Sequence, residues 1–287
     1  MTGNATPNDT INGSATLLAS PQYLFVDVTN NRLFVANQGA GSILVFENAS
    51  TKNGNVAPER NISGPSTTLV GPVDMALDSS RNLLYVADGA NVLVFASAST
   101  VTGNTAPVRT IAVGFSVDAI LLDSGGDRMF LVDGTGNAIN VYDSASTLSH
   151  VVSPNRTISG PHTQLSAPAG LQLDSLGRLV VSNLAGKAIT IYANAVTASG
   201  NISPNASMTG SNTQLAGPTQ IAVTTSNNTL FVADGIAASV LVFANLNTSS
   251  GNAVPTNAIK GANTGFARSA GGTGPATAKG VALDPTR

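Results

Sequence analysis

A proline-anchored phrase recurs about every fifty residues along this chain. The pattern Gly-Asn-x-x-Pro occurs at Gly3–Pro7, Gly54–Pro58, Gly103–Pro107, Gly200–Pro204 and Gly251–Pro255, and a degenerate copy, Val151–Pro154, fills one further slot. Successive prolines are therefore spaced 51, 49, 47, 50 and 51 residues apart. Repetition at this period predicts a solenoid, a propeller or an array, in which each unit buries its apolar faces against its neighbours.

Residues 55–100 give the clearest copy of the repeat, with four short runs rich in Val, Leu, Ile and aromatic residues. Gly, Asn, Asp and Ser separate these runs, which predicts β-strands, and no long window has the apolar spacing of a helix. A run of the type aromatic-Val-Ala-Asp recurs at Phe34–Asn37, Tyr85–Asp88, Phe130–Asp133, Val180–Asn183 and Phe231–Asp234. The run that follows it recurs at Ile43–Phe46, Leu93–Phe95, Ile139–Tyr142, Ile189–Tyr192 and Val240–Phe243. Four antiparallel strands in about fifty residues predict one propeller blade per repeat.

The segments Pro72–Asp78 and Leu84–Asp88 resemble the repeats of the NHL and YVTN families of bacterial β-propellers, and the resemblance covers essentially the whole chain. It implies a propeller fold. It does not imply one activity, because those families include lyases, lactonase-like hydrolases and pure binding scaffolds.

We therefore expect an all-β chain that folds as a single β-propeller domain over residues 1–287, with five complete four-stranded blades and an incomplete sixth. Gly280–Asp284 matches the strand at Ala76–Asp78, but the two strands that should follow it are missing. Residues 3–13 resemble the outermost strand of a preceding blade. This predicts either a fragment, truncated at its C-terminus, or a blade that a neighbouring subunit completes with its own strands.

The composition argues against several classes of protein. Only 10% of the residues are charged and the net charge is −2, with no basic stripe, so we expect no nucleic-acid partner. The absence of cysteine excludes disulfides and thiolate metal sites, and no apolar run is long enough to span a bilayer. The given sequence has no signal peptide. Low charge with abundant Thr, Asn, Ser and Gly favours an extracellular or cell-surface protein.

Most charged residues recur in step with the repeat, which indicates structural roles. Arg32, Arg81, Arg128, Arg178 and Arg287 are expected at one hairpin position, and Arg60, Arg109 and Arg156 just before the outer strand, where they cover turns or bond neighbouring carbonyls. Asp27, Asp78, Asp123, Asp174 and Asp284 end one strand, where a carboxylate can accept turn N–H groups. Asp88, Asp133 and Asp234 end the next strand and exchange with Asn37 and Asn183, which favours hydrogen bonding over acid–base catalysis.

No catalytic residue is predicted. His150 and His162 lie in a linker and a loop without zinc-ligand spacing, and neither a Gly-x-Ser-x-Gly elbow nor a Walker loop occurs.

One group of residues remains as a candidate site. The strand ending in Ala-φ-Asp should be innermost, with its first residues at the mouth of a central channel. The family pattern has Gly four residues before that Asp, but other residues replace it in several blades. The resulting candidates for a ligand or metal at the channel mouth are Tyr23, Asp74, Asp118 and Gln220. Two carboxylates with an amide could bind Ca²⁺, and the alternative is that these side chains line a water-filled pore.

Two functions follow from these observations. The first is a non-catalytic extracellular module for binding or assembly, with a protein partner or a second copy and without a cofactor. The alternative is a lactonase- or lyase-like propeller enzyme with a cation at the channel mouth.

Overall fold

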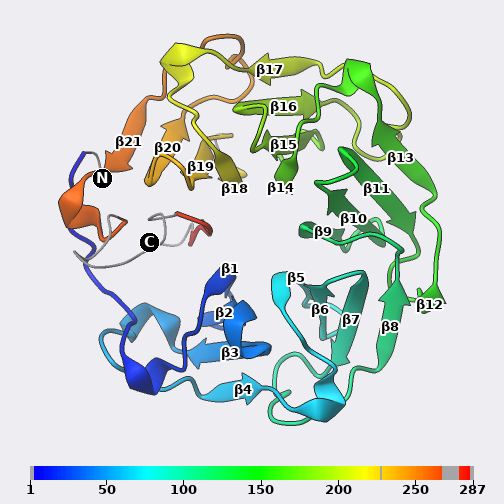
Figure 1. Ribbon diagram of the computed structural model, residues 1–287, viewed down its shortest axis with the longest axis vertical. Helices are drawn as coiled ribbons and strands as arrows, with labels where there is room; N and C mark the ends of the chain where they lie inside the picture. The colour runs from blue at the N-terminus through cyan, green and yellow to red at the C-terminus, as the bar shows by residue number, and fades with distance from the viewer. Residues whose placement is uncertain (1–2, 227, 267–277, 285–287) are drawn as a thin grey trace. The chain divides into compact units, whose positions relative to one another are not determined.

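The chain is all-β in the computed structural model, which describes residues 3–226, 228–266 and 278–284 (Figure 1). It forms five four-stranded antiparallel blades, so the predicted all-β class and the predicted blade are confirmed. Residues 280–284, predicted as an inner strand, form no strand in the structure, and Arg287 lies outside the described residues.

The strands follow one another in chain order within the blades. Blade 1 contains β1 (Pro21–Asp27), β2 (Arg32–Asn37), β3 (Ser42–Glu47) and β4 (Arg60–Ile62). Blade 2 contains β5 (Pro72–Asp78), β6 (Leu83–Asp88), β7 (Asn91–Ala96) and β8 (Arg109–Ala112), with the short β12 (His150–Val151) parallel to β8. Blade 3 contains β9 (Ala119–Asp123), β10 (Arg128–Asp133), β11 (Ala138–Asp143) and β13 (Arg156–Ser159). Blade 4 contains β14 (Pro168–Leu173), β15 (Leu179–Asn183), β16 (Ala188–Tyr192) and β17 (Ala206–Met208). Blade 5 contains β18 (Pro218–Val223), β19 (Leu230–Asp234), β20 (Ser239–Phe243) and β21 (Asn257–Lys260).

The chain divides into two compact units. The N-terminal unit comprises Asp9–Asp133 and Asn140–Asn155, and the C-terminal unit comprises Gly134–Ile139 and Arg156–Pro285 together with Met1–Asn8. Inner strand β5 contacts β1 and β9 in the N-terminal unit, and β14 contacts β18 in the C-terminal unit. That a single domain covers residues 1–287 stays a prediction.

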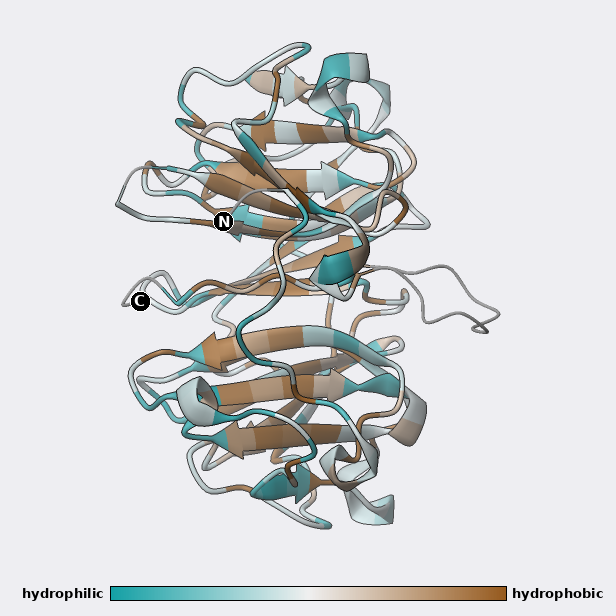
Figure 2. Cartoon of the chain, turned by 90° about the vertical axis from the view of Figure 1, so that its left-hand side faces the viewer, coloured by the Kyte–Doolittle hydropathy of each residue, from teal (hydrophilic) through white to brown (hydrophobic). Residues whose placement is uncertain are grey.

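Apolar residues on the strands supply the core of each unit. Figure 2 shows brown, hydrophobic segments along the strands and paler or teal segments in many of the connecting loops. In the N-terminal unit, Phe34 and Phe95 pack in one cluster between blades 1 and 2, while Tyr85 and Tyr142 pack in another between blades 2 and 3. Phe231, the aromatic residue of the recurring run in blade 5, is only partly buried.

The Gly-Asn-x-x-Pro phrase of one repeat forms a clamp on the outer strand of the preceding repeat and on the turn that follows that strand. In blade 1, Gly103 bridges Ile62 of β4 in parallel, and Asn104 Oδ1 accepts the N–H of Ser66 at 2.7 Å. Gly64 lies against the Asn104 side chain, because a Cβ at Gly64 would lie 2.6 Å from Asn104 Oδ1. The same Gly–Asn clamp joins Gly13 to Asn55, Gly160 to Asn201, Gly210 to Asn252 and Gly261 to Asn4.

A buried threonine completes each clamp. Thr67 donates its hydroxyl to the carbonyl of Gly64 at 2.7 Å, and the short 3-10 helix between them is η4 (Pro65–Thr67). The equivalent threonines are Thr16, Thr163, Thr213 and Thr264. A three-residue 3-10 turn held at both ends therefore recurs at each clamp.

The degenerate repeat lacks both halves of the clamp. His150 occupies the position of the glycine, with φ of 63°, and pairs with Ile111 of β8 as the glycines pair elsewhere. Val151 replaces the asparagine and is 86% exposed, and Val113 follows Ile111 of β8 where Gly64 follows Ile62 of β4. The parallel strand pairing therefore persists here without the side-chain clamp.

Candidate functional site

Three of the four candidate residues lie on innermost strands of their blades. Tyr23, Asp74 and Gln220 each stand two residues after the proline that begins the strand, where the pairing register shifts in β1, β5 and β18. Asp118 is exposed and directly precedes β9, where its N–H donates to the carbonyl of Val132 at 3.0 Å. Tyr23, Asp74 and Asp118 belong to the N-terminal unit, whereas Gln220 belongs to the C-terminal unit.

Asp74 joins two neighbouring inner strands. Its Oδ1 accepts the N–H of Met75 at 2.6 Å, and its Oδ2 accepts the N–H of Ile120 in β9 at 2.8 Å. The side chain is buried, and burial raises the pKa of this carboxyl well above its ordinary value, although the two N–H groups act in the opposite direction. Oδ2 thus links β5 to β9, while Oδ1 bonds the backbone of its own strand.

Tyr23 lies in the electrostatic field of Asp74. Burial of its hydroxyl raises the pKa of Tyr23 well above its ordinary value, and the negative charge of Asp74 raises it further. Both groups therefore favour their neutral forms, which makes the pair a weak cation ligand compared with two ionised carboxylates.

The equivalent position in the C-terminal unit is built differently. Gly170 of β14 lies so close to β18 that a Cβ would stand 2.6 Å from the carbonyl oxygen of Thr219. Ser182 donates its hydroxyl to that same carbonyl. Gln220 is buried, and its Oε1 has no hydrogen-bond partner among the residues that the structure describes.

A metal-binding set does not emerge from these candidates. Within residues 3–226, 228–266 and 278–284, no three His, Cys, Asp or Glu side chains are grouped as metal ligands. The expectation of Ca²⁺ therefore stays a prediction. His162, exposed in its loop, uses its backbone N–H to bond Asn201 in a Gly–Asn clamp.

For six of the eight recurring aspartates, the structure shows the hydrogen bonds that the sequence predicts. Asp78 accepts the N–H of Arg81 at 3.1 Å in the first turn of its blade, and Asp27, Asp123 and Asp174 act likewise. Asp88 accepts the N–H groups of Val70 and Gly71 at 2.7 and 3.0 Å. Asn37, Asn183 and Asp234 accept equivalent loop N–H groups, which explains why Asp and Asn can exchange there.

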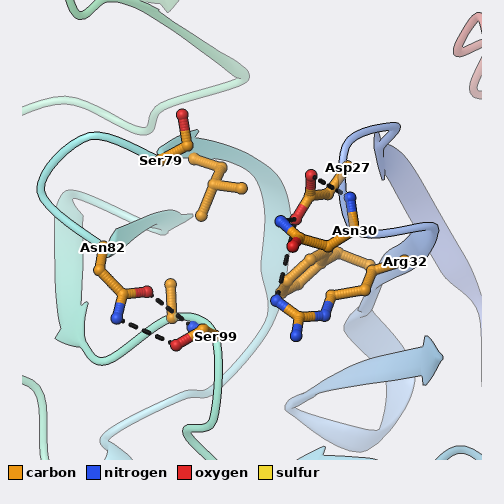
Figure 3. Close-up of a pocket in the computed structure, with 9 residues that line it drawn as sticks. Asp27, Asn30, Arg32, Ser79, Asn82 and Ser99 are labelled. Carbon is orange, nitrogen blue, oxygen red and sulfur yellow. Dashed lines mark hydrogen bonds and ion pairs between the residues drawn. The ribbon is translucent and has the colours of Figure 1, made fainter.

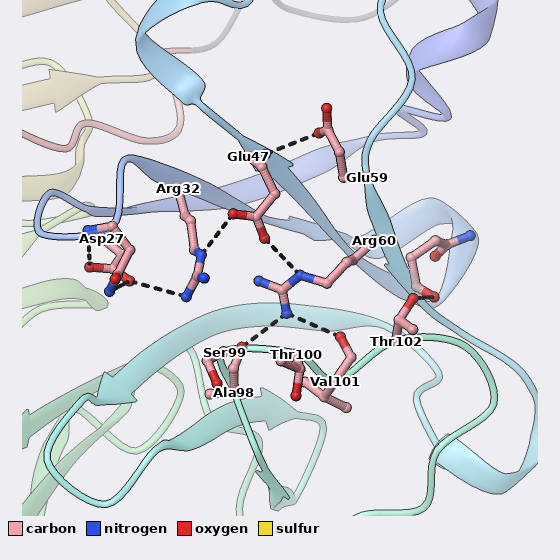
Figure 4. Close-up of polar contacts among 12 residues, drawn as sticks. Asp27, Arg32, Glu47, Glu59, Arg60, Ala98, Ser99, Thr100, Val101 and Thr102 are labelled. Atoms are coloured by element: carbon pink, nitrogen blue, oxygen red, sulfur yellow. Dashed lines mark hydrogen bonds and ion pairs between the residues drawn. The ribbon is translucent and has the colours of Figure 1, made fainter.

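Arg60 and Arg109, two of the three outer-strand arginines, bond neighbouring carbonyls, as predicted. Arg60 Nη1 donates to the carbonyls of Ala98 and Val101 at 2.9 and 3.1 Å (Figure 4). Its guanidinium also lies 5.5 Å from the ring centroid of Phe34. Arg109 repeats this arrangement with the carbonyls of Ala145 and Leu148, and with the ring of Tyr85. These arginines bind one blade to the loop of the next.

The hairpin arginines do not share one position, so that part of the prediction is wrong. Arg32 and Arg128 open the second strand directly opposite Asp27 and Asp123, whereas Arg81 lies inside its turn. They nevertheless share a partner, because each forms an ion pair with the aspartate that ends its own first strand. In each blade the arginine therefore reaches the equivalent aspartate, although it starts from a different position in the hairpin.

Comparison with protein-family models finds no match, and comparison with curated proteins finds none either. Among solved structures, the chain is similar to a functionally unknown protein from Desulfotomaculum acetoxidans DSM 771, with a TM-score of 0.58 and 15% sequence identity. The match covers 86% of this chain and 74% of that one. At this identity the likeness concerns the fold alone. In the part of the chain that the structure describes, no helix is long and apolar enough to cross a membrane.

Proposed function

We propose that this chain is a non-catalytic, extracellular propeller module that binds a protein partner by accepting a β-hairpin. The receiving edge is the segment Thr10–Asn12, which we interpret as the outer strand of the incomplete sixth blade. The observation that carries the proposal is the one-sided pairing of Ile11.

Ile11 has the position of an outer-strand residue. It bridges Gly54 in parallel, as Ile62 bridges Gly103 and Met208 bridges Gly251. Each of those outer strands also pairs on its other edge with the third strand of its blade, for example Ile62 with Ile43. Ile11 has no such antiparallel partner among the described residues. One edge of this strand is therefore open.

The backbone groups at this edge are the ones that a partner strand needs. The carbonyl of Thr10 accepts the N–H of Gly54 at 2.6 Å, and the N–H of Asn12 donates to the carbonyl of Gly54 at 3.1 Å. Backbone groups alternate in direction along a strand, so the N–H and carbonyl of Ile11 are directed to the opposite edge. Addition of a strand there would satisfy both groups.

An apolar cluster lies beside this edge. Val35, Leu44 and Phe46 of blade 1 are buried in it, and Ile11 and Val56 pack against them. A hairpin that resembles the second and third strands of the other blades would place apolar residues on such a surface and backbone donors on the edge. The partner chemistry is thus an amphipathic hairpin of alternating apolar residues.

A non-catalytic role is supported by how the charged side chains are used. The recurring aspartates hold turns, Arg60 and Arg109 bond carbonyls, and Asp74 connects inner strands. The extracellular location is supported by composition alone, since 10% of the residues are charged and Ser, Thr and Asn dominate the turns.

A synthetic hairpin with the sequence of residues 82–97 tests the binding proposal. The labelled peptide should bind the protein in fluorescence anisotropy, and Ile11→Pro should abolish binding because proline removes the backbone donor. The folded protein should keep its melting temperature in this variant, since the Ile11 N–H bonds no described residue. Ile11→Val is the matched control and should bind as wild type.

Failure of the peptide to bind, or equal binding by Ile11→Pro, would reject the hairpin-binding function. Elemental analysis tests the non-catalytic half separately. Stoichiometric Ca²⁺ in the purified protein that is lost in Asp74→Ala would favour the enzyme alternative instead.

A further inference from the structure

A polar pocket of about 320 Å³ lies between blades 1 and 2 of the N-terminal unit. Asp27, Asn30 and Arg32 of the first hairpin line one side, and Ser79 lies on the other (Figure 3). Leu77 forms part of the apolar wall. The volume falls at the small end of the range of ligand pockets in proteins.

The arginine in this pocket can be compared directly with its equivalent in blade 3. Arg32 and Arg128 both open the second strand of their blade, and each donates Nε to a carboxylate of the third strand, Glu47 at 2.8 Å and Asp143 at 3.1 Å. Their second partner distinguishes them. Arg128 Nη1 lies 2.8 Å from Asp123 Oδ2, whereas Arg32 Nη1 lies 3.9 Å from Asp27 Oδ2.

One residue in the turn accounts for this difference. Blade 1 has Asn30 where blade 3 has Gly126, and each donates its backbone N–H to the aspartate of its hairpin. The side-chain Nδ2 of Asn30 also donates to Asp27 Oδ2 at 2.8 Å, and so occupies the oxygen that the arginine would bind.

The geometry at Gly126 shows that a side chain at this position of the turn is incompatible with the close arginine–aspartate ion pair. A Cβ at Gly126 would lie 2.3 Å from Asp123 Oδ2 and 2.4 Å from Arg128 Nη1. Glycine therefore permits the closed pair in blade 3. Asn30 holds the pair open in blade 1.

The open pair leaves donors and an acceptor at the pocket. Nη1 and Nη2 of Arg32 make no hydrogen bond to any residue that the structure describes, and the side chain is 19% exposed. The carbonyl oxygen of the Asn30 side chain likewise accepts no hydrogen bond within the described chain. Figure 3 shows the guanidinium directed toward the space between the two hairpins. A planar guanidinium edge of this kind binds two oxygen atoms at once.

The charges around the pocket determine whether an anionic or a neutral oxygen ligand fits beside Arg32. Asp27 and Glu47 lie within ion-pair distance of Arg32, and Glu47 is shared with Arg60 (Figure 4). Two carboxylates thus balance two guanidinium groups. An anionic ligand would meet both carboxylates without a net positive charge to compensate, whereas neutral hydroxyl oxygens would not be repelled.

We propose that this pocket binds a neutral, hydroxyl-rich small molecule of the size of one sugar ring. Arg32 donates to two hydroxyl oxygens, Asn30 Oδ1 accepts from a third, and Leu77 covers the apolar face of the ring. This site goes beyond the proposed function, since it shares neither the edge at Ile11 nor its partner.

Saturation-transfer NMR and calorimetry with D-glucose, D-galactose and N-acetyl-D-glucosamine test the proposal, with acetate and D-glucuronate as anionic probes. We expect binding of at least one neutral sugar and a preference for it over both anions. Asn30→Gly should let Arg32 close onto Asp27 and weaken binding by about tenfold or more, while the melting temperature is kept or raised.

The matched control is Arg128→Lys, which makes a conservative change at the equivalent arginine and should leave sugar binding unchanged. Arg32→Lys, which loses the planar fork, should weaken binding. The proposal is overturned if no neutral sugar binds, if the anions bind more tightly, or if Asn30→Gly binds sugar as wild type does.

Discussion

The Gly–Asn clamp predicts that adding a single methyl group at Gly64 lowers the stability of the protein. This glycine has φ of 119° and ψ of 167°, a region that essentially only glycine adopts, and holding alanine there costs about 1–3 kcal/mol. The added Cβ would also lie 2.6 Å from Asn104 Oδ1, and such overpacking costs about 1–3 kcal/mol. Gly64→Ala should therefore lower the free energy of unfolding by about 2–6 kcal/mol.

Gly103→Ala is the matched control, because the two glycines belong to the same clamp. Gly103 has φ of 68° and no atom within 4 Å of a Cβ, so only the left-handed backbone is penalised, by about 1–2 kcal/mol. Asn104→Ala should cost about 1 kcal/mol for its hydrogen bond. In the double variant with Gly64→Ala, removal of the close contact should return part of the loss.

Urea denaturation measures all four variants against wild type. The reasoning is refuted if Gly64→Ala is no more destabilising than Gly103→Ala, or if the double variant shows simple additivity. Either result would mean that the Asn104 side chain does not press on Gly64 in solution.

Two further predictions concern the core and the inner strands. Phe95→Ala removes a fully buried aromatic side chain and should lower the free energy of unfolding by about 3–5 kcal/mol. Asp88→Asn should cost less, because asparagine keeps an acceptor for one of the two N–H groups. Equal melting temperatures of the two variants would contradict this order. Burial raises the pKa of Asp74, so the stability from this group is fully present below its unfolded pKa and falls as the pH rises through its folded pKa. From about pH 4 upward, the free energy of unfolding of Asp74→Asn minus that of wild type should therefore increase with pH. A difference that stays constant or decreases with pH would argue against a buried, neutral carboxyl.

Repetition explains why the fold could be predicted from the sequence. Each strand pattern occurs in five copies, so a strand that is unclear in one repeat can be identified from the others. The presence of Asn37 at the position of Asp88 already indicates a hydrogen-bonding role for this residue. The repeat also predicts its own exceptions, since His150 and Val151 break the phrase where the clamp is absent.

The site was harder to predict because it depends on distances that the pattern does not contain. The repeat pattern puts Asp74 near the start of an inner strand, but only the structure shows that Asp74 Oδ2 accepts the N–H of Ile120 in the next blade. The pocket at Arg32 was missed for a similar reason. The sequence difference that indicates the pocket is Asn30 in blade 1 at the position of Gly126 in blade 3. This difference can be seen only when Arg32 is aligned with Arg128 and not with Arg81.

Amide hydrogen exchange at Ile11 tests the open strand most directly. In the protein alone, this amide should exchange rapidly, while the amide of Ile62, whose strand pairs on both edges, should be protected. Addition of the hairpin peptide should slow exchange at Ile11 without changing Ile62. An Ile11 amide that is already as protected as Ile62, or that does not respond to the peptide, would contradict the proposed binding edge.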